Sequence, residues 1–108
     1  ENLGVPELRV IAGEAPAALD QLSGPPDAVF IGGGVTAATL AACWRALMSG
    51  GRLVANAVTL DGERALLDFH AAAGGDLTRI AIERIEALGA HDAMKPQRAV
   101  LQLAAFKP

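Results

Sequence analysis

The stretch from Asp27 to Gly34 constrains the fold most strongly, because a short apolar run ends there in three consecutive glycines. A continuous apolar run of this length between turn residues is typical of a parallel strand that is buried on both faces. In open α/β sheets ligands bind at the carboxyl ends of the strands, and glycine lets a ligand approach the backbone closely. We therefore expect a ligand site at Gly32 to Gly34, with a tight turn that binds nothing as the alternative.

The composition favours an α/β domain. Of the 108 residues 52% are hydrophobic but only 4% are aromatic, so Ala, Leu, Val and Ile must form the core, which suits helices packed on a parallel sheet. The net charge of -3 and the scattered basic residues argue against nucleic acid or an anionic membrane as a partner. The single cysteine, Cys43, excludes an internal disulfide framework, and we expect it to be a small buried residue in a soluble, cytoplasmic protein.

Hydrophobic periodicity and turn residues predict alternating strands and helices. Strands are expected at 8–12, 27–31, 52–58, 77–85 and 99–106, and helices at about 16–22, 36–48 and 63–73, the second with Thr36 as its N-cap. Residues 88–98 are expected to form a loop. This connection leaves no room for a crossover helix, so the last two strands should form an antiparallel pair.

Three segments carry a resemblance to a known family: Gly13-Glu-Ala-Pro16, Pro26-Asp-Ala-Val-Phe-Ile-Gly-Gly-Gly34 and Gly50-Gly-Arg-Leu-Val-Ala-Asn-Ala-Val-Thr-Leu60. Residues 77–80 and 105–108 support it, so that it spans the whole chain. With these segments the chain resembles class I S-adenosylmethionine-dependent methyltransferases. Within that superfamily it is most similar to the domains of cobalamin biosynthesis that methylate C15 of a precorrin and decarboxylate it.

The resemblance implies that the chain is the latter half of a Rossmann-like domain, with a mostly parallel sheet and a final antiparallel strand pair. Methyltransferases of this class open with a strand and a Gly-rich loop that holds the cofactor, and neither occurs before Leu8. We therefore interpret residues 1–108 as a single partial domain. In the superfamily two further strands lie between the strand at Leu8 and the strand at Asp27, so these two are not expected to be neighbours here.

The resemblance also implies the ligands. The cofactor would be S-adenosylmethionine, bound by Gly13, Glu14 and Ala15 on its adenine side and by Gly32 and Gly33, while Gly33, Gly34, Asn56 and Thr59 would contact the precorrin. Methyl transfer from a sulfonium needs mainly proximity and alignment, so no catalytic residue and no metal ligand is assigned. The partner would be a precorrin, together with further copies of the chain in a homo-oligomer, a tetramer as in related domains.

Other interpretations stay open at the level of the sequence. Thr59 could instead cap the following helix, and Asn56 could hydrogen-bond the backbone at the glycines. The chain could also be half of an NAD-type dehydrogenase or of another small-molecule methyltransferase, or a non-catalytic α/β module that forms oligomers.

Overall fold

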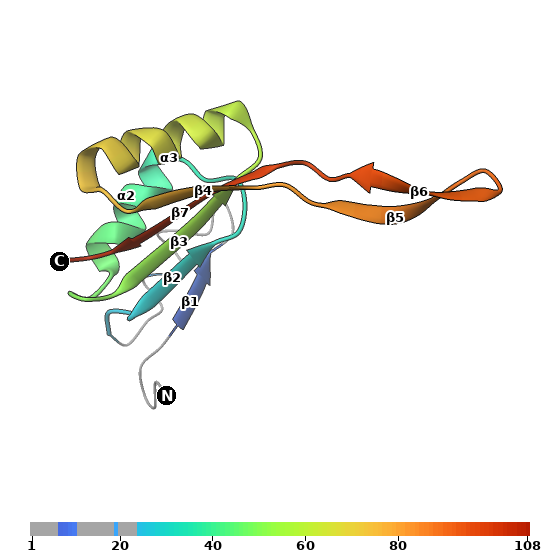
Figure 1. The fold of residues 1–108 in the computed structure, drawn as a ribbon. Coiled ribbons are helices and arrows are strands. Elements are labelled where there is room, and N and C mark those ends of the chain that lie inside the picture. The colour runs from blue at the N-terminus through green and yellow to red at the C-terminus, as the bar shows by residue number, and fades with distance from the viewer. Residues whose placement is uncertain (1–6, 11–18, 20–23) are drawn as a thin grey trace.

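The central element is a five-stranded sheet with the order β1-β2-β3-β7-β4 (Figure 1). The structure, a computed structural model, describes residues 7–10, 19 and 24–108. The strands of this sheet are β1 (Glu7–Val10), β2 (Ala28–Ile31), β3 (Arg52–Ala57), β4 (Asp76–Ile80) and β7 (Val100–Phe106). β1, β2 and β3 are parallel, and β7 runs antiparallel between β3 and β4. The predicted α/β class and the final antiparallel pair are therefore confirmed.

One expectation about the sheet is wrong for this chain. β1 and β2 are neighbours, with Leu8 opposite Val29 and Val10 opposite Ile31, although two further strands were expected to separate them. The backbone groups along the edge of β2 need hydrogen-bond partners, and β1 supplies them directly.

Helices α2 (Ala37–Ala46) and α3 (Leu60–Ala73) cover one face of the sheet (Figure 1). The buried strand residues show this, because they alternate along each strand and join the buried residues of both helices in a single core. This core is formed by Val29, Ile31, Leu53, Ala55, Ala57, Leu101 and Leu103 from the strands and by Leu40, Cys43 and Leu66 from the helices. The predicted stripe of Leu40, Cys43, Trp44 and Leu47 is confirmed, with Trp44 only partly buried.

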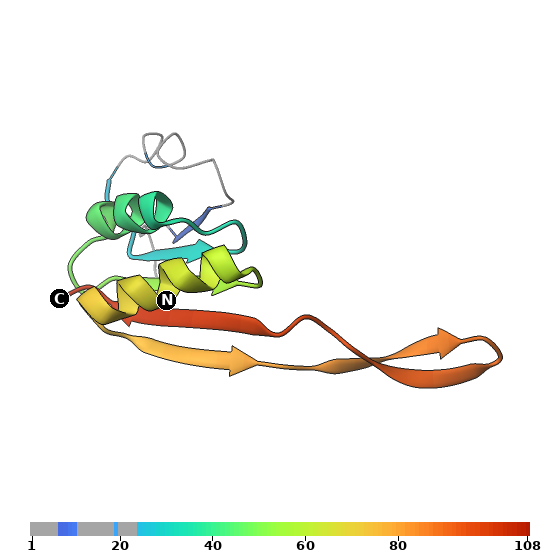
Figure 2. The same cartoon turned by 90° about the horizontal axis from the view of Figure 1, so that it is seen from above.

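Residues 83–96 form a β-hairpin that projects from the rest of the molecule (Figure 2). This segment includes most of the predicted loop and the end of the strand that was predicted before it. β5 (Glu83–Leu88) and β6 (His91–Pro96) pair antiparallel, and a two-residue turn joins Leu88 to His91. Gly89 lies in this turn with a φ of 61°, a conformation that glycine adopts at no steric cost. The prediction of a loop at 88–98 is therefore wrong, because cross-strand pairing gives structure to a segment without strong local periodicity.

Candidate functional site at the carboxyl edge of the sheet

The glycines after β2 and the residues after β3 line one small pocket at the carboxyl edge of the parallel strands. Its volume is about 130 Å³, and its walls are Gly32, Gly33, Gly34, Val35, Asn56, Ala57, Val58, Thr59, Gly62 and Val100. Gly32, Gly33, Gly34, Asn56 and Thr59, which were assigned from the sequence, therefore come together at a single site. Their assembly follows from the parallel pairing of β2 with β3, which brings both carboxyl ends to the same edge.

The glycine segment leaves its backbone open to this pocket. A Cβ atom placed on Gly33 would meet no heavy atom within 4 Å, so the space beside its backbone is free. Gly34 adopts a φ of 61°, which other residues rarely tolerate, and the chain turns there toward α2. The three glycines thus form both a turn and an accessible backbone surface.

Thr59 is the N-cap of α3. Its hydroxyl accepts a hydrogen bond of 3.1 Å from the backbone N–H of Gly62, and α3 consequently begins at Leu60, three residues earlier than predicted. Gly62 packs closely beneath it, because an added Cβ would lie 3.0 Å from the Cβ of Ala57. The capping role left open at the level of the sequence is therefore present, whereas contact with substrate stays a prediction.

Asn56 lies one residue before the end of β3 and is half-buried. Its Oδ1 accepts a hydrogen bond of 3.0 Å from Nε2 of Gln102, which is its register partner on β7. The alternative contact with the glycine backbone is not the one observed. Sequence reasoning missed Gln102, and the only local signal for it was a polar residue between Leu101 and Leu103 in a strand.

The three residues assigned to the adenine side, Gly13, Glu14 and Ala15, lie outside the described residues. Their role in cofactor binding stays a prediction.

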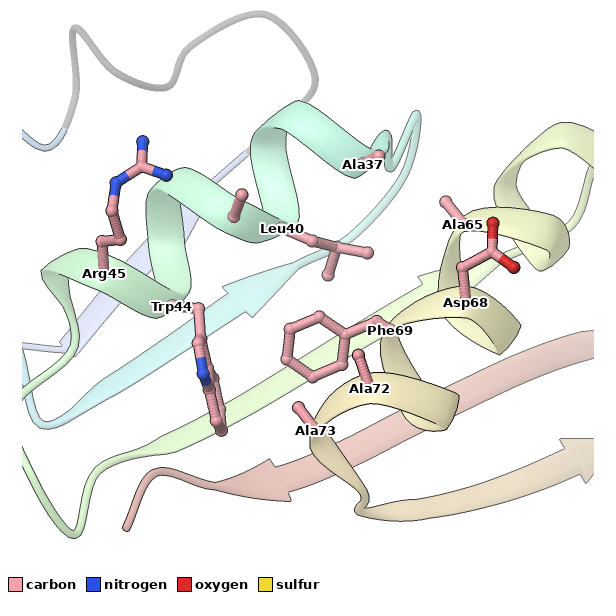
Figure 3. A pocket seen from close by; sticks show the side chains of 10 residues that line it. Ala37, Leu40, Trp44, Arg45, Ala65, Asp68, Phe69, Ala72 and Ala73 are labelled. Atoms are coloured by element: carbon pink, nitrogen blue, oxygen red, sulfur yellow. The ribbon is translucent and has the colours of Figure 1, made fainter.

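A larger apolar groove of about 420 Å³ lies between α2 and α3 (Figure 3). Trp44 and Phe69 approach each other across it edge to face, with ring centroids 5.0 Å apart and an interplanar angle of 88°. Ligand sites normally combine apolar walls with a few convergent polar groups. Among the described residues, the only charged ones that line this groove are Arg45 and Asp68, which come from different helices and do not pair with each other, so we place the candidate site at the smaller pocket.

Titratable groups contribute little to the site. Within residues 7–10, 19 and 24–108, no group of three His, Cys, Asp or Glu side chains could hold a metal ion. Burial raises the pKa of the Cys43 thiol, which suits the core position expected for it. In the same part of the chain no helix is long and apolar enough to cross a membrane.

Comparison with known proteins decides the family. The family model described as the precorrin methyltransferase domain matches residues 1–107. The chain belongs to this family. The chain is therefore part of a precorrin methyltransferase domain and not half of an NAD-type dehydrogenase.

Individual relatives agree with this family. The chain is 54% identical over 100 residues to the precorrin-6Y C(5,15)-methyltransferase [decarboxylating] of a Sinorhizobium species, which corresponds to 92% of this chain and 24% of that protein. A solved targeted domain of a precorrin-6Y C5,15-methyltransferase from Corynebacterium diphtheriae is 42% identical, with a TM-score of 0.79 over 87% of this chain and 56% of that one. The C-terminal domain of the precorrin-6Y C5,15-methyltransferase from Rhodobacter capsulatus is 45% identical, with a TM-score of 0.75 over 86% of this chain and 50% of that one.

The chain thus spans about a quarter of that curated relative and about half of the solved domains that it matches. The described part of it contains the carboxyl edge with the glycines, Asn56 and Thr59.

Proposed function

We propose that this chain is part of an enzyme that transfers a methyl group from S-adenosylmethionine to C15 of a precorrin and removes carbon dioxide from the C12 acetate side chain. The observation that supports this most strongly is the 54% identity to a decarboxylating precorrin-6Y methyltransferase over 92% of the chain. The glycine-lined pocket at the carboxyl edge of the sheet supplies a site that suits such a reaction.

The residues of the pocket fit a cofactor that lies against backbone. Gly32 and Gly33 present main-chain atoms with free space beside Gly33, and a Cβ there would occupy that space. S-adenosylmethionine supplies a methyl group on a sulfonium, which is already activated for transfer, so the protein contributes mainly alignment and exclusion of water. Pockets that hold ligands of this size have volumes of roughly 300–1,000 Å³. We therefore assign to this chain one wall of the cofactor site, and we propose that Gly13, Glu14 and Ala15 add the adenine side.

For the precorrin we propose contacts with Gly33, Gly34, Asn56 and Thr59. The support is that the carboxyl ends of β2 and β3 open on one pocket, whose lining includes Asn56. A precorrin carries many carboxylates, and an amide can donate hydrogen bonds to their oxygens.

We further propose that the enzyme is a homo-oligomer assembled through the β5–β6 hairpin. The radius of gyration of the chain is 16.2 Å, whereas a compact domain of this length has about 13 Å, and the projecting hairpin accounts for the difference (Figure 1). A two-stranded hairpin is only marginally stable by itself in water. A partner molecule that packs against the hairpin would supply the stability that the hairpin lacks by itself.

One face of the hairpin has an apolar centre flanked by Glu83 and Asp92, and the other face carries Arg84, Glu86 and Lys95. Its register places Ile85 opposite Met94 on one face, with exposed fractions of 71% and 57%, and Arg84 opposite Lys95 on the other. Charges of both signs on the hairpin argue against a membrane or nucleic acid as the partner. A second copy brings an identical apolar centre, and two such centres can cover each other around a twofold axis. The cytoplasmic location inferred from the sequence stays a prediction.

The activity is tested with the full-length protein that contains this chain. Incubation with S-adenosylmethionine carrying a labelled methyl group and with the precorrin substrate should label the tetrapyrrole, and mass spectrometry should show loss of one carbon dioxide from the product. Full-length protein that binds S-adenosylmethionine but labels no tetrapyrrole would contradict the proposed substrate. Protein that binds no S-adenosylmethionine in calorimetry would contradict the proposed function as a whole.

A further inference from the structure

The β5–β6 hairpin continues the β4–β7 strand pair, but the two pairs are out of register with each other by one residue. The last pair of the sheet is Ile80 with Val100, and the first pair of the hairpin is Glu83 with Pro96. Two residues therefore separate these pairs on the side that leads from β4 to β5, whereas three residues separate them on the side that leads from β6 to β7. One strand of the ribbon thus carries one residue more than its partner.

The additional residue forms a β-bulge. The backbone N–H of Gln97 donates a hydrogen bond of 2.9 Å to the carbonyl oxygen of Ile82, so the register of the hairpin extends as far as this pair. Arg98 and Ala99 then both stand opposite Ala81. Two residues that oppose one residue of the partner strand are the arrangement of a β-bulge.

The bulge joins two registers that are fixed independently of each other. In β7 a slip of one residue would turn Leu101 and Leu103 from the core to the opposite face of the sheet. In the hairpin Gly89 is the first of two turn residues and has a φ of 61°, as a type II′ turn requires. The bulge absorbs the difference of one residue between the two registers.

A bulge also bends its strand and increases the local twist, so it sets the direction of the part of the ribbon that lies beyond it. The hairpin beyond this bulge is so strongly twisted that its two strands cross in the view of Figure 2. This distal part carries the cross-strand pair of Ile85 and Met94, both of which are exposed. The direction in which this apolar pair points therefore depends on the bulge.

We infer that the bulge at Arg98 and Ala99 is a positioning element that aims the pair of Ile85 and Met94 at a second copy of the chain. Two such pairs cover each other around a twofold axis only when each hairpin leaves its sheet in a direction that keeps the rest of the two molecules apart. The bulge fixes this direction, because it is the joint between the hairpin and the sheet. This inference rests on the proposed assembly through the hairpin.

Two variants remove the bulge without changing either register. Deletion of Arg98 leaves two residues on each side of the joint, and insertion of one alanine between Ala81 and Ile82 leaves three on each side. In both variants Ile85 stays opposite Met94 and the register of the sheet is kept, so only the direction of the hairpin changes. Arg98→Ala is the matched control, because it keeps the additional residue and removes only its side chain.

The full-length protein is measured by light scattering at micromolar concentration, and calorimetry with S-adenosylmethionine shows whether each variant is folded. The wild-type protein and Arg98→Ala should have the same oligomeric mass. The deletion variant and the insertion variant should both bind S-adenosylmethionine with an unchanged Kd but should dissociate to smaller species. Loss of the oligomer in a folded protein that keeps the pairing of Ile85 with Met94 is the result that only an aiming role of the bulge predicts.

An unchanged oligomeric mass in either folded variant without the bulge would overturn the inference. An equal loss of mass in Arg98→Ala would overturn it too, because the side chain and not the additional residue would then be responsible. If one of the two variants does not fold, the other decides. A monomeric wild-type protein would instead refute the proposed assembly, and a wild-type protein that binds no S-adenosylmethionine would refute the proposed activity, so these failures are distinguishable.

Discussion

The ammonium group of Lys107 donates a hydrogen bond of 2.7 Å to the carbonyl oxygen of Leu47, which follows α2 in the chain. A second hydrogen bond of 3.2 Å reaches the carbonyl oxygen of Arg45 in the last turn of the helix. A cation at this end stabilises a helix, because the last carbonyl groups have no partners within it and the helix dipole is negative there. The backbone of Lys107 also pairs with Gly50 and Gly51, so the carboxyl end of the chain is attached to the α2–β3 connection.

Replacing Lys107 by Met should lower the free energy of unfolding by about 1 kcal/mol, because the carbonyl groups at the end of α2 lose a charged donor. Urea denaturation of the full-length protein measures this as a lower midpoint with an unchanged slope. Lys95→Met is the control, since the exposed side chain of Lys95 forms, among the described residues, only a surface ion pair of 3.4 Å with Glu86. Equal destabilisation by both substitutions would contradict a specific role for Lys107.

The ion pair between Arg79 on β4 and Glu63 on α3 should make stability depend on pH. Arg79 donates to both carboxylate oxygens of Glu63, at 2.9 and 3.2 Å, and these hydrogen bonds hold the pKa of Glu63 below its usual value. A lowered folded-state pKa contributes stability that is present above the unfolded-state pKa of about 4.3 and is lost as the pH falls through the folded-state pKa. Arg79→Gln should therefore lower the melting temperature at pH 7 and have progressively less effect as the pH falls below 4.3.

Melting curves of the full-length protein between neutral and acid pH test this prediction. Arg64→Gln is the control, because its partner Asp61 is almost fully exposed and this ion pair should contribute little at any pH. A difference between wild-type protein and Arg79→Gln that stays constant down to the lowest pH would show that Glu63 is not the titrating partner.

Thr59→Ala should destabilise the protein by about 1 kcal/mol, because it removes the acceptor for the backbone N–H of Gly62 at the start of α3. Thr59→Ser retains the hydroxyl and should restore stability. If Thr59 also contacts the precorrin, Thr59→Ala should in addition raise KM in the folded enzyme. Normal kinetics in Thr59→Ala would leave Thr59 as a cap only and would remove it from the proposed substrate site.

The double substitution Ile85→Glu and Met94→Glu should convert the full-length oligomer to smaller species, because it places four like charges where two apolar faces would meet. Light scattering at micromolar protein concentration measures the change. Arg84→Ser on the charged face of the hairpin is the control and should leave the mass unchanged. A wild-type protein that is already monomeric under these conditions would contradict assembly through the hairpin.

Local patterns in the sequence were sufficient for the order of elements and for much of the core. Thr36 was predicted as the cap of α2, and it accepts a hydrogen bond from the backbone N–H of Thr39. The apolar spacing of Leu40, Cys43 and Leu47 predicted their burial, and the absence of a crossover helix before the last strand predicted an antiparallel final pair. These features follow from interactions within a few turns or within one strand, which the order of residues encodes directly.

Features that depend on register were decided only by the tertiary structure. Asn56 and Gln102 lie 46 positions apart, and only the pairing of β3 with β7 brings their amides together. The hairpin at 83–96 and the pairing of β1 with β2 likewise depend on backbone groups finding partners across strands, for which the local pattern gives little signal. Glycines after a strand therefore indicated where a ligand site could form, whereas the hydrogen bond of Asn56 with Gln102 depends on a neighbour that only the folded sheet supplies.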